Sequence, residues 1–213
     1  MSRQYSKKFV VALFVVSTIV AGFAFGAYQG LFGRPPVPTM TTLRKATVLP
    51  DSMALPDFHL VDHEGAPFGP DRLTGRWSLV FFGFANCGHV CPFTLRTLAD
   101  ATRMLDAPPR IVFISVDPGR DTPDVLARYV RGFNADMTGV SGEDAEIRRL
   151  AAALGVAYTV RPEPAPYVVE HSPAVFVLDP QGRYTAVIAA ADDAGLIAAD
   201  LRDLVGATVP DFT

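Results

Sequence analysis

The chain has 213 residues, of which 49% are apolar and 19% charged, which excludes a disordered or collagen-like chain and suits one domain with an additional segment. Six basic residues and no acidic ones precede Asp51, and from there on 13 basic residues stand against 22 acidic ones. This acidic net charge argues against a nucleic-acid binder, which needs a basic face. The two cysteines are too few for a scaffold held by several disulfides.

The N-terminal segment has the features of a membrane anchor. Residues 1–8 form a basic cytoplasmic tail that ends in Lys7 and Lys8, and residues 9–28 are an apolar run of 20 residues. At about 1.5 Å per residue, such a helix spans the roughly 30 Å of a bilayer core, and the basic end stays in the cytoplasm. A cleaved signal peptide is the alternative, although its apolar core is shorter, about 7–15 residues. We expect a single pass through the inner (cytoplasmic) membrane, with the C-terminal domain in the periplasm.

Residues 29–54 are predicted to form a proline-stiffened linker, and residues 55–213 the folded domain. A short strand is expected at residues 58–61, and the continuous apolar run over residues 77–82 is typical of a buried central strand. The apolar spacing predicts a helix over residues 92–105, and residues 111–116 form a second buried strand.

Capping and turn residues place the later elements. Thr122 and Pro123 predict a helix start, and Ser141 is expected to cap a helix that runs to Leu154. Residues 179–182 suit a hairpin between strands at 174–178 and 184–188, and a last helix covers residues 192–204. Strands that alternate with helices indicate an α/β fold with parallel first crossovers. The closing hairpin and helix suit a thioredoxin-like sandwich with an N-terminal transmembrane helix.

Both cysteines lie between Phe84 and Pro92, in the segment that joins a predicted buried strand to a predicted helix. Sites in α/β sheets are built where strands end, and a helix N-terminus favours the thiolate because its N–H groups are unpaired. Cys87 and Cys91 are four residues apart, so both fall on one helical face and their sulfurs can bind one ion or close into a disulfide. Two thiolates favour Cu(I) or zinc.

A static disulfide is an alternative for this pair, but a bridge that closes so short a loop adds little stability. A metal site needs a third ligand, and the chain has four histidines. We interpret His59 and His63 as surface residues and His89 as either exposed or a ligand. His171 directly precedes a predicted buried strand, and if that strand neighbours the central one, the imidazole can face the cysteines. His171 is therefore the best third ligand, and two thiolates with one imidazole suit Cu(I).

Four segments, covering most of residues 55–205, resemble the Sco/SenC family of membrane-anchored copper chaperones with a thioredoxin fold. They are residues 81–84 leading into Cys87-x-x-x-Cys91-Pro92, residues 115–123, Tyr129 with Phe133, and Glu170-His171-Ser172 running into residues 178–182. Each is weak alone, and their joint occurrence in order makes the resemblance specific.

The resemblance implies that Cys87, Cys91 and His171 bind copper and that the two cysteines are redox-active. It implies delivery of copper to the binuclear centre of cytochrome c oxidase subunit II, or reduction of that subunit's cysteines, with copper leaving by ligand exchange. A thiol reductant or another copper chaperone is a further expected partner. Three positions depart from the family: Gly88-His89 replaces Pro-Asp and adds an imidazole, and Glu170 replaces Asp.

Other functions remain open from the residues alone. An exported thiol–disulfide oxidoreductase without a copper role needs only Cys87 and Cys91. A thiol peroxidase is disfavoured because Phe84 stands where that pattern wants Thr, and a purely structural domain leaves the clustered residues unexplained. Asp117, Arg120 and Asp121 either form a turn and helix start or support the site and its docking face.

Overall fold

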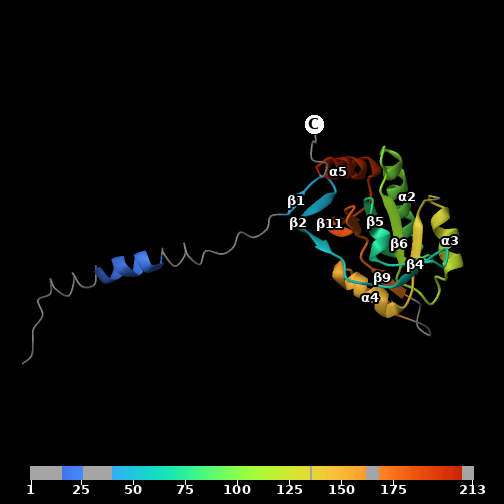
Figure 1. Cartoon of the computed structure of the whole chain (residues 1–213), viewed down its shortest axis with the longest axis horizontal. Coiled ribbons are helices and arrows are strands. Elements are labelled where there is room, and N and C mark those ends of the chain that lie inside the picture. Colours follow the sequence, from blue (N-terminus) through green and yellow to red (C-terminus); the bar gives the residue numbers. More distant parts are fainter. Residues whose placement is uncertain (1–15, 26–39, 135, 162–167, 208–213) are drawn as a thin grey trace, which may run out of the picture. The chain divides into compact units, whose positions relative to one another are not determined.

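The structure is a computed structural model that describes residues 16–25, 40–134, 136–161 and 168–207 (Figure 1). The chain divides into two compact units, Met1–Pro38 and Thr39–Thr213. Within the first unit, residues 16–25 are helical. Among the described residues, no helix has both the length and the apolar character that crossing a membrane requires. The anchor predicted over residues 9–28 lies partly outside the described residues.

Within the described part of the second unit, nine strands form one sheet in the order β1-β2-β11-β10-β5-β6-β7-β3-β4 (Figure 1). The central strand β5 (Ser78–Gly83) pairs parallel with β6 (Arg110–Ser115), and β6 pairs parallel with β7 (Thr138–Ser141). The remaining pairs are antiparallel and involve β1 (Thr41–Thr42), β2 (Ala46–Ala54), β3 (Leu60–Asp62), β4 (Pro67–Phe68), β10 (Val175–Leu178) and β11 (Arg183–Ile188). The buried central strand and the parallel crossovers predicted from the sequence are confirmed.

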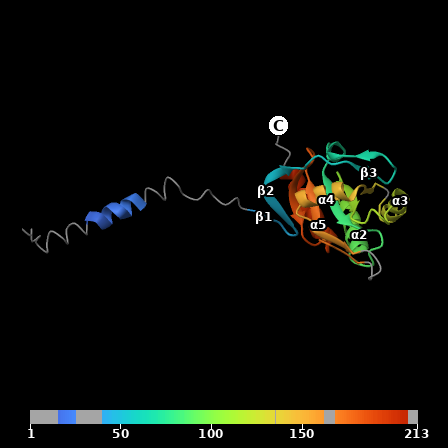
Figure 2. The same cartoon turned by 90° about the horizontal axis from the view of Figure 1, so that it is seen from below.

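Helices cover both faces of this sheet. The side chains of α2 (Val90–Arg103), α3 (Pro123–Arg131) and α5 (Ala194–Ala207) join one core cluster, and those of α4 (Asp144–Ala153) join the other. Strand β5 contributes side chains to both clusters: Leu79 and Phe81 belong to the first, and Val80 and Phe82 belong to the second. Burial on both faces explains its uninterrupted apolar run. Figures 1 and 2 place β1 and β2 at one side of the domain and α3 at the other.

Two element boundaries predicted from local sequence signals are confirmed. The Thr122 hydroxyl accepts a hydrogen bond from the Val125 N–H at 3.4 Å, and α3 begins at Pro123 as predicted. The hairpin between β10 and β11 turns on Asp179, whose carboxylate accepts the N–H groups of Gln181 and Arg183, each at 2.9 Å. Gly182 adopts φ of +73°, a conformation that glycine adopts without strain.

The predicted linker over residues 29–54 is wrong in its C-terminal part. Strand β2 pairs with β11 at both of its ends, from Ala46 opposite Ile188 to Ala54 opposite Arg183, with an irregularity between Val48 and Met53, so these residues belong to the domain. Pro50 obscured the strand, because proline removes a ladder donor and is tolerated only where one side is unpaired. Such a side exists here, since β1 covers only the stretch of β2 around Thr47 and Val48.

Further differences concern short elements. Ser141 ends strand β7 instead of capping a helix, and α4 begins at Asp144, with Glu143 at the capping position. The hairpin of β8 (Tyr158–Arg161) and β9 (Val168–His171) forms a separate two-stranded sheet, and η1 (Pro70–Leu73) is a single turn of 3₁₀ helix. These elements are too short for a periodic pattern to develop in the sequence.

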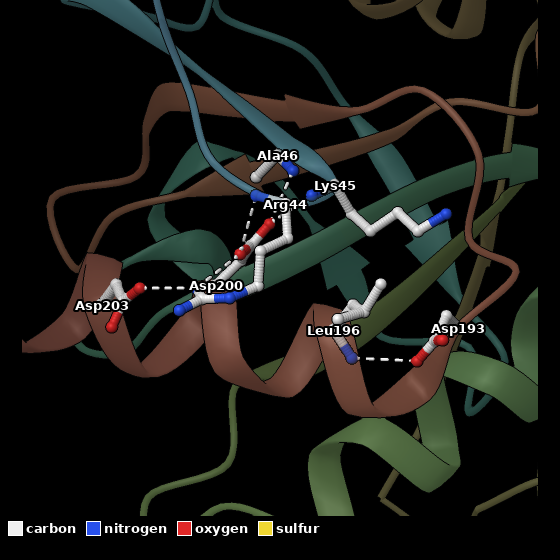
Figure 3. A network of polar contacts seen from close by, with 7 residues as sticks. All are labelled: Arg44, Lys45, Ala46, Asp193, Leu196, Asp200 and Asp203. Atoms are coloured by element: carbon white, nitrogen blue, oxygen red, sulfur yellow. Dashed lines mark hydrogen bonds and ion pairs between the residues drawn. The ribbon is translucent and has the colours of Figure 1, made fainter.

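A buried carboxylate joins the N-terminal strands to the last helix (Figure 3). Asp200 of α5 is fully buried and accepts the backbone N–H groups of Arg44, Lys45 and Ala46 at 3.1, 2.6 and 2.8 Å. The Arg44 guanidinium also bridges Asp200 at 3.1 Å and the exposed Asp203 at 2.7 Å. The turn between β1 and β2 is thereby held on α5.

Candidate metal centre

The cysteine segment leaves the middle of the sheet and enters a helix. Strand β5 ends at Gly83, and α2 begins at Val90, so that Cys91 lies in its first turn and Cys87 in the preceding loop. Cys91 is completely buried, whereas Cys87 is half-buried. The Cys91 N–H points at the Cys87 sulfur at 3.5 Å, so an N–H group of the first helical turn stabilises the thiolate form of Cys87. Both cysteines are free thiols.

Gly83 makes room for the buried sulfur. A Cβ at this position would lie 2.9 Å from the Cys91 sulfur and 2.7 Å from the Phe113 ring, closer than packed atoms approach. The end of the central strand therefore needs glycine because of a close approach. Sequence reasoning missed this requirement, since the two contacts come from other elements.

His171 reaches the cysteines from the end of β9, eighty residues after Cys91 in the chain. Its Nε2 lies 3.3 Å from the Cys91 sulfur, and its Nδ1 lies 2.9 Å from the Ser172 carbonyl oxygen. The rings of Phe81 and Phe84 meet the imidazole edge-on, with centroids at 5.8 and 6.0 Å. These phenylalanines fix the ring orientation, a role that the sequence did not reveal.

The three predicted ligands come together in the structure. The donor atoms of Cys87, Cys91 and His171 all lie within 4.8 Å of one another. Bonds of about 2.0–2.3 Å from imidazole and thiolate put three donors around a trigonal ion about 3.5–4 Å apart. The observed spacing therefore needs only small side-chain shifts to hold one soft ion. The expected proximity of His171 is observed, and metal binding by the three residues stays a prediction.

The protonation states suit such an ion. Burial raises the pKa of Cys87, but hydrogen bonds from the Cys91 N–H and thiol and from the N–H groups of His89 and Val90 outweigh it, and the pKa lies below its ordinary value. Burial, followed by the neighbouring Cys87, raises the pKa of Cys91 strongly. Burial also lowers the pKa of His171, which keeps the ring neutral. With Nδ1–H donating to the Ser172 carbonyl, the lone pair of Nε2 faces the sulfurs.

A family model described as SCO1/SenC matches residues 48–206. The chain belongs to the SCO1/SenC family. The human protein named "Protein SCO2 homolog, mitochondrial" is 37% identical over 136 residues, which are 61% of this chain and 51% of the human one. The corresponding Bos taurus protein is 35% identical over 153 residues, 68% of this chain and 58% of its own length. The chain thus spans between half and three fifths of these relatives.

Solved Sco structures share the fold of the second unit. Yeast Sco1 with copper bound aligns with a TM-score of 0.69 and 28% identity over 75% of this chain and 92% of that one. Arabidopsis thaliana ScoI with copper bound aligns with a TM-score of 0.67 and 27% identity over 71% and 98%. These alignments confirm the predicted thioredoxin-like α/β fold.

Within the Sco fold, the two aspartates of the segment over residues 115–123, Asp117 and Asp121, have different roles. Asp121 is 2% exposed, and its carboxylate accepts the Ala85 N–H at 2.9 Å and the Ser115 hydroxyl at 2.6 Å. It thereby ties the loop that carries Cys87 to the end of β6. Asp117 instead pairs with Arg120 at 2.5 Å within the turn. Asp117 thus belongs to a turn and Asp121 supports the site, so each of the two interpretations made from the sequence describes part of this segment.

The side chains of the other three histidines are not part of the donor cluster of this Sco domain. His59 is exposed, with Glu146 and Asp57 at 3.9 and 4.0 Å, as a surface residue should be. His63 is half-buried and its Nδ1 accepts the Gly139 N–H at 3.1 Å, which corrects its interpretation as a surface residue. His89 is exposed at the start of α2.

Proposed function

We propose that this protein is a membrane-anchored copper chaperone that binds Cu(I) through Cys87, Cys91 and His171. The observation that carries the proposal is the convergence of two sulfurs and one neutral imidazole nitrogen within 4.8 Å. Soft thiolates with imidazole select Cu(I) over magnesium or calcium. Membership of the SCO1/SenC family and the copper-bound Sco structures support the choice of copper.

The unequal exposure of the ligands suggests how copper leaves. Cys91 is closed off by the core, and Cys87 is the half-exposed ligand that an incoming thiol can reach. We infer that the recipient is the binuclear copper centre of cytochrome c oxidase subunit II, supplied by exchange of one thiolate for another. Loading by another copper chaperone, or reduction of the subunit's cysteines by the same pair, fits this scheme.

We also propose that residues 9–28 anchor the protein in the inner membrane, with residues 1–8 in the cytoplasm and the Sco domain in the periplasm. The support is the apolar run of 20 residues behind Lys7 and Lys8. A reporter enzyme that works only in the periplasm, fused after Thr213, should be active. Activity of a cytoplasmic reporter at the same place would overturn the orientation.

A thiol–disulfide oxidoreductase is the second candidate function, and one observation favours it. The half-exposed Cys87 has a lowered pKa beside a buried Cys91 with a raised pKa, an arrangement of an attacking and a resolving thiol. This chemistry needs no imidazole at His171, and that difference separates the two functions.

A Cu(I) titration of the full chain in detergent, against a competing Cu(I) chelator, tests the proposal. Reduced protein should bind one Cu(I), and oxidised protein none. The His171→Ala variant should bind at least about 100-fold more weakly, because changes outside the ligand set already cost about 10- to 100-fold. His59→Ala, which removes an exposed histidine outside the donor cluster, is the matched control and should bind as the wild type does.

Failure of reduced wild-type protein to bind Cu(I) would remove the chaperone function. Unchanged binding in His171→Ala, together with retained reduction of a model disulfide, would instead leave the oxidoreductase. Cys87→Ser should abolish both activities, which checks that the two assays report on the same thiols.

A further inference from the structure

A shallow cavity of about 470 Å³, wide open to solvent, lies beside the cysteine loop. Its walls include Ala85 and Asn86, the two residues before Cys87, and one side of helix α3. The volume lies within the roughly 300–1,000 Å³ of pockets that take small ligands or side chains. A group bound there would lie within a few residues' reach of the exposed ligand.

One wall of this cavity carries a positive charge that is not neutralised among the described residues. Arg120 is paired with Asp117 at 2.5 Å. Arg128 is exposed and has no ion pair or hydrogen bond to any described residue. Asp124, one turn earlier on α3, forms no ion pair with it. Asp121 also lines the cavity but is buried, and its Oδ2 atom accepts both the Ala85 N–H and the Ser115 hydroxyl. The exposed charge at the rim of the cavity is thus the guanidinium of Arg128, on a domain that is acidic overall.

Another part of the cavity wall is apolar. Val125 and the ring of Tyr129 line it, and the Tyr129 hydroxyl oxygen is buried without a hydrogen-bond partner among the described residues. Buried hydroxyls are normally hydrogen-bonded, and this one is shielded from the solvent that fills the cavity. The cavity therefore combines an apolar wall with an exposed guanidinium, a combination that suits a carboxylate on a short aliphatic stem.

We propose that this cavity receives an acidic side chain of the partner protein that exchanges copper with Cys87. In the partner's sequence, this acidic residue lies one to three residues from the cysteine that receives the copper. The proposal rests on the copper function proposed above, and it adds the kind of partner segment that binds beside the metal centre. A chain segment covers about 3.3–3.6 Å per residue, so a carboxylate at this spacing reaches the cavity while its cysteine meets the loop. Arg128 then orients the incoming thiol and attracts an acidic segment that the rest of the domain repels.

The transfer itself involves no change of oxidation state. Each new bond between Cu(I) and an incoming sulfur replaces one to Cys87 or Cys91, and the proton lost by the incoming thiol passes to the leaving thiolate. The cavity therefore affects the rate of encounter and the orientation of the partner, and it leaves the affinity of the centre for copper unchanged.

The test compares copper transfer from the loaded full chain in detergent to two receiver peptides of equal length, each with a pair of cysteines. One peptide carries Glu beside its cysteines and the other carries Gln. The ratio of their transfer rates should favour Glu in the wild type and fall about twofold to fivefold in Arg128→Gln, the range for an exposed charge pair. Arg131→Gln is the matched control, because Arg131 is exposed on the same helix but does not line the cavity.

An equal Glu-to-Gln ratio in wild type and Arg128→Gln, or an equal fall in Arg131→Gln, would overturn the proposal. A copper titration of each variant checks that the metal centre is intact. If the wild type bound no copper, the copper function would fail, and the cavity would still be tested by thiol reagents. The ratio of the rate of Cys87 with the anionic disulfide dithiobis-nitrobenzoate to its rate with neutral dithiodipyridine should then fall in Arg128→Gln and stay unchanged in Arg131→Gln.

Discussion

At the scale of single residues, the thiols of Cys87 and Cys91 differ in pKa, although they are only four positions apart in the chain. With its lowered pKa, Cys87 should become thiolate at a lower pH than an ordinary cysteine, whose pKa is about 8.5. Cys91, buried and with a raised pKa, should stay protonated over the same range. In the reduced, metal-free protein, alkylation by iodoacetamide should therefore modify Cys87 first, with a rate that rises at a lower pH than that of a free thiol.

Mass spectrometry of peptides after timed alkylation between pH 6 and pH 9 measures this difference. Protein unfolded in urea is the control, because both cysteines should then react at the same rate. Equal labelling of the two cysteines in the folded protein would show that burial and the helix start do not separate them.

Gly83 gives a second prediction at this scale. The Gly83→Ala substitution places a methyl group against the Cys91 sulfur and the Phe113 ring, at 2.9 and 2.7 Å. Overpacking of this kind costs about 1–3 kcal/mol, and relief by movement of the sulfur should also weaken Cu(I) binding. Urea unfolding followed by the fluorescence of Trp77, the chain's single tryptophan, measures the stability.

Gly88→Ala is the matched control for this substitution, because a Cβ on Gly88 would have no atom within 4 Å. It lies in the same loop and should leave stability and Cu(I) binding near wild type. A Gly83→Ala protein with unchanged stability and copper affinity would show that the sulfur position tolerates the methyl group.

The sequence predicted the side chains of the centre better than their surroundings. Cys87, Cys91 and His171 were identifiable because thiol and imidazole chemistry is rare and clustered at element ends. Their supports were not, because Gly83 and the Phe81 and Phe84 rings act through contacts between distant segments. The sequence linked positions 91 and 171 only on the condition that the strand after His171 neighbours the central one, and the family resemblance also implied that link.

At the scale of elements, the contact between the first strands and α5 depends on one carboxylate. Replacing Asp200 by Ala removes the acceptor of three backbone N–H groups and should cost about 3 kcal/mol of unfolding free energy. Asp203→Asn is the control, since Asp203 makes only an exposed ion pair with Arg44, and such pairs contribute about 0–1 kcal/mol. Equal effects of the two substitutions in urea unfolding would contradict this account.

The pH dependence of this contact follows from the direction of the pKa shift. Burial raises the pKa of Asp200, but the N–H groups of Lys45, Ala46 and Arg44 outweigh it, so the folded pKa lies below the ordinary value. A carboxylate with a lowered pKa stabilises the fold at pH values above its unfolded pKa of about 3.9. The difference in unfolding free energy between wild type and Asp200→Asn should therefore be constant from pH 7 to about pH 5 and shrink as pH falls further.

The elements that the sequence predicted are those with strong local signals. The helix α3 has its cap and proline, and β5 is buried on both faces, so each segment carries its own pattern. The strands β2, β7 and β9 depend on their partners, because they are short, half-exposed or interrupted by proline. Pairing between distant segments stabilises them, and a local reading of the chain has no access to it.

At the scale of the whole molecule, the extent of the Sco domain can be tested by truncation. The compact unit starts at Thr39, and its strand β2 covers β11, buries Ala46 completely and supplies the N–H groups that Asp200 accepts. A fragment of residues 39–213 should therefore unfold at the same temperature as the full chain. A fragment of residues 55–213 exposes β11 as an edge and leaves the Asp200 carboxylate buried without its partners, a loss comparable to the roughly 5–15 kcal/mol that stabilises a whole domain. We expect it to be unfolded or aggregated by circular dichroism and size-exclusion chromatography. Equal thermal stability of the two fragments would restore residues 41–54 to the linker and show that β2 is dispensable for the fold.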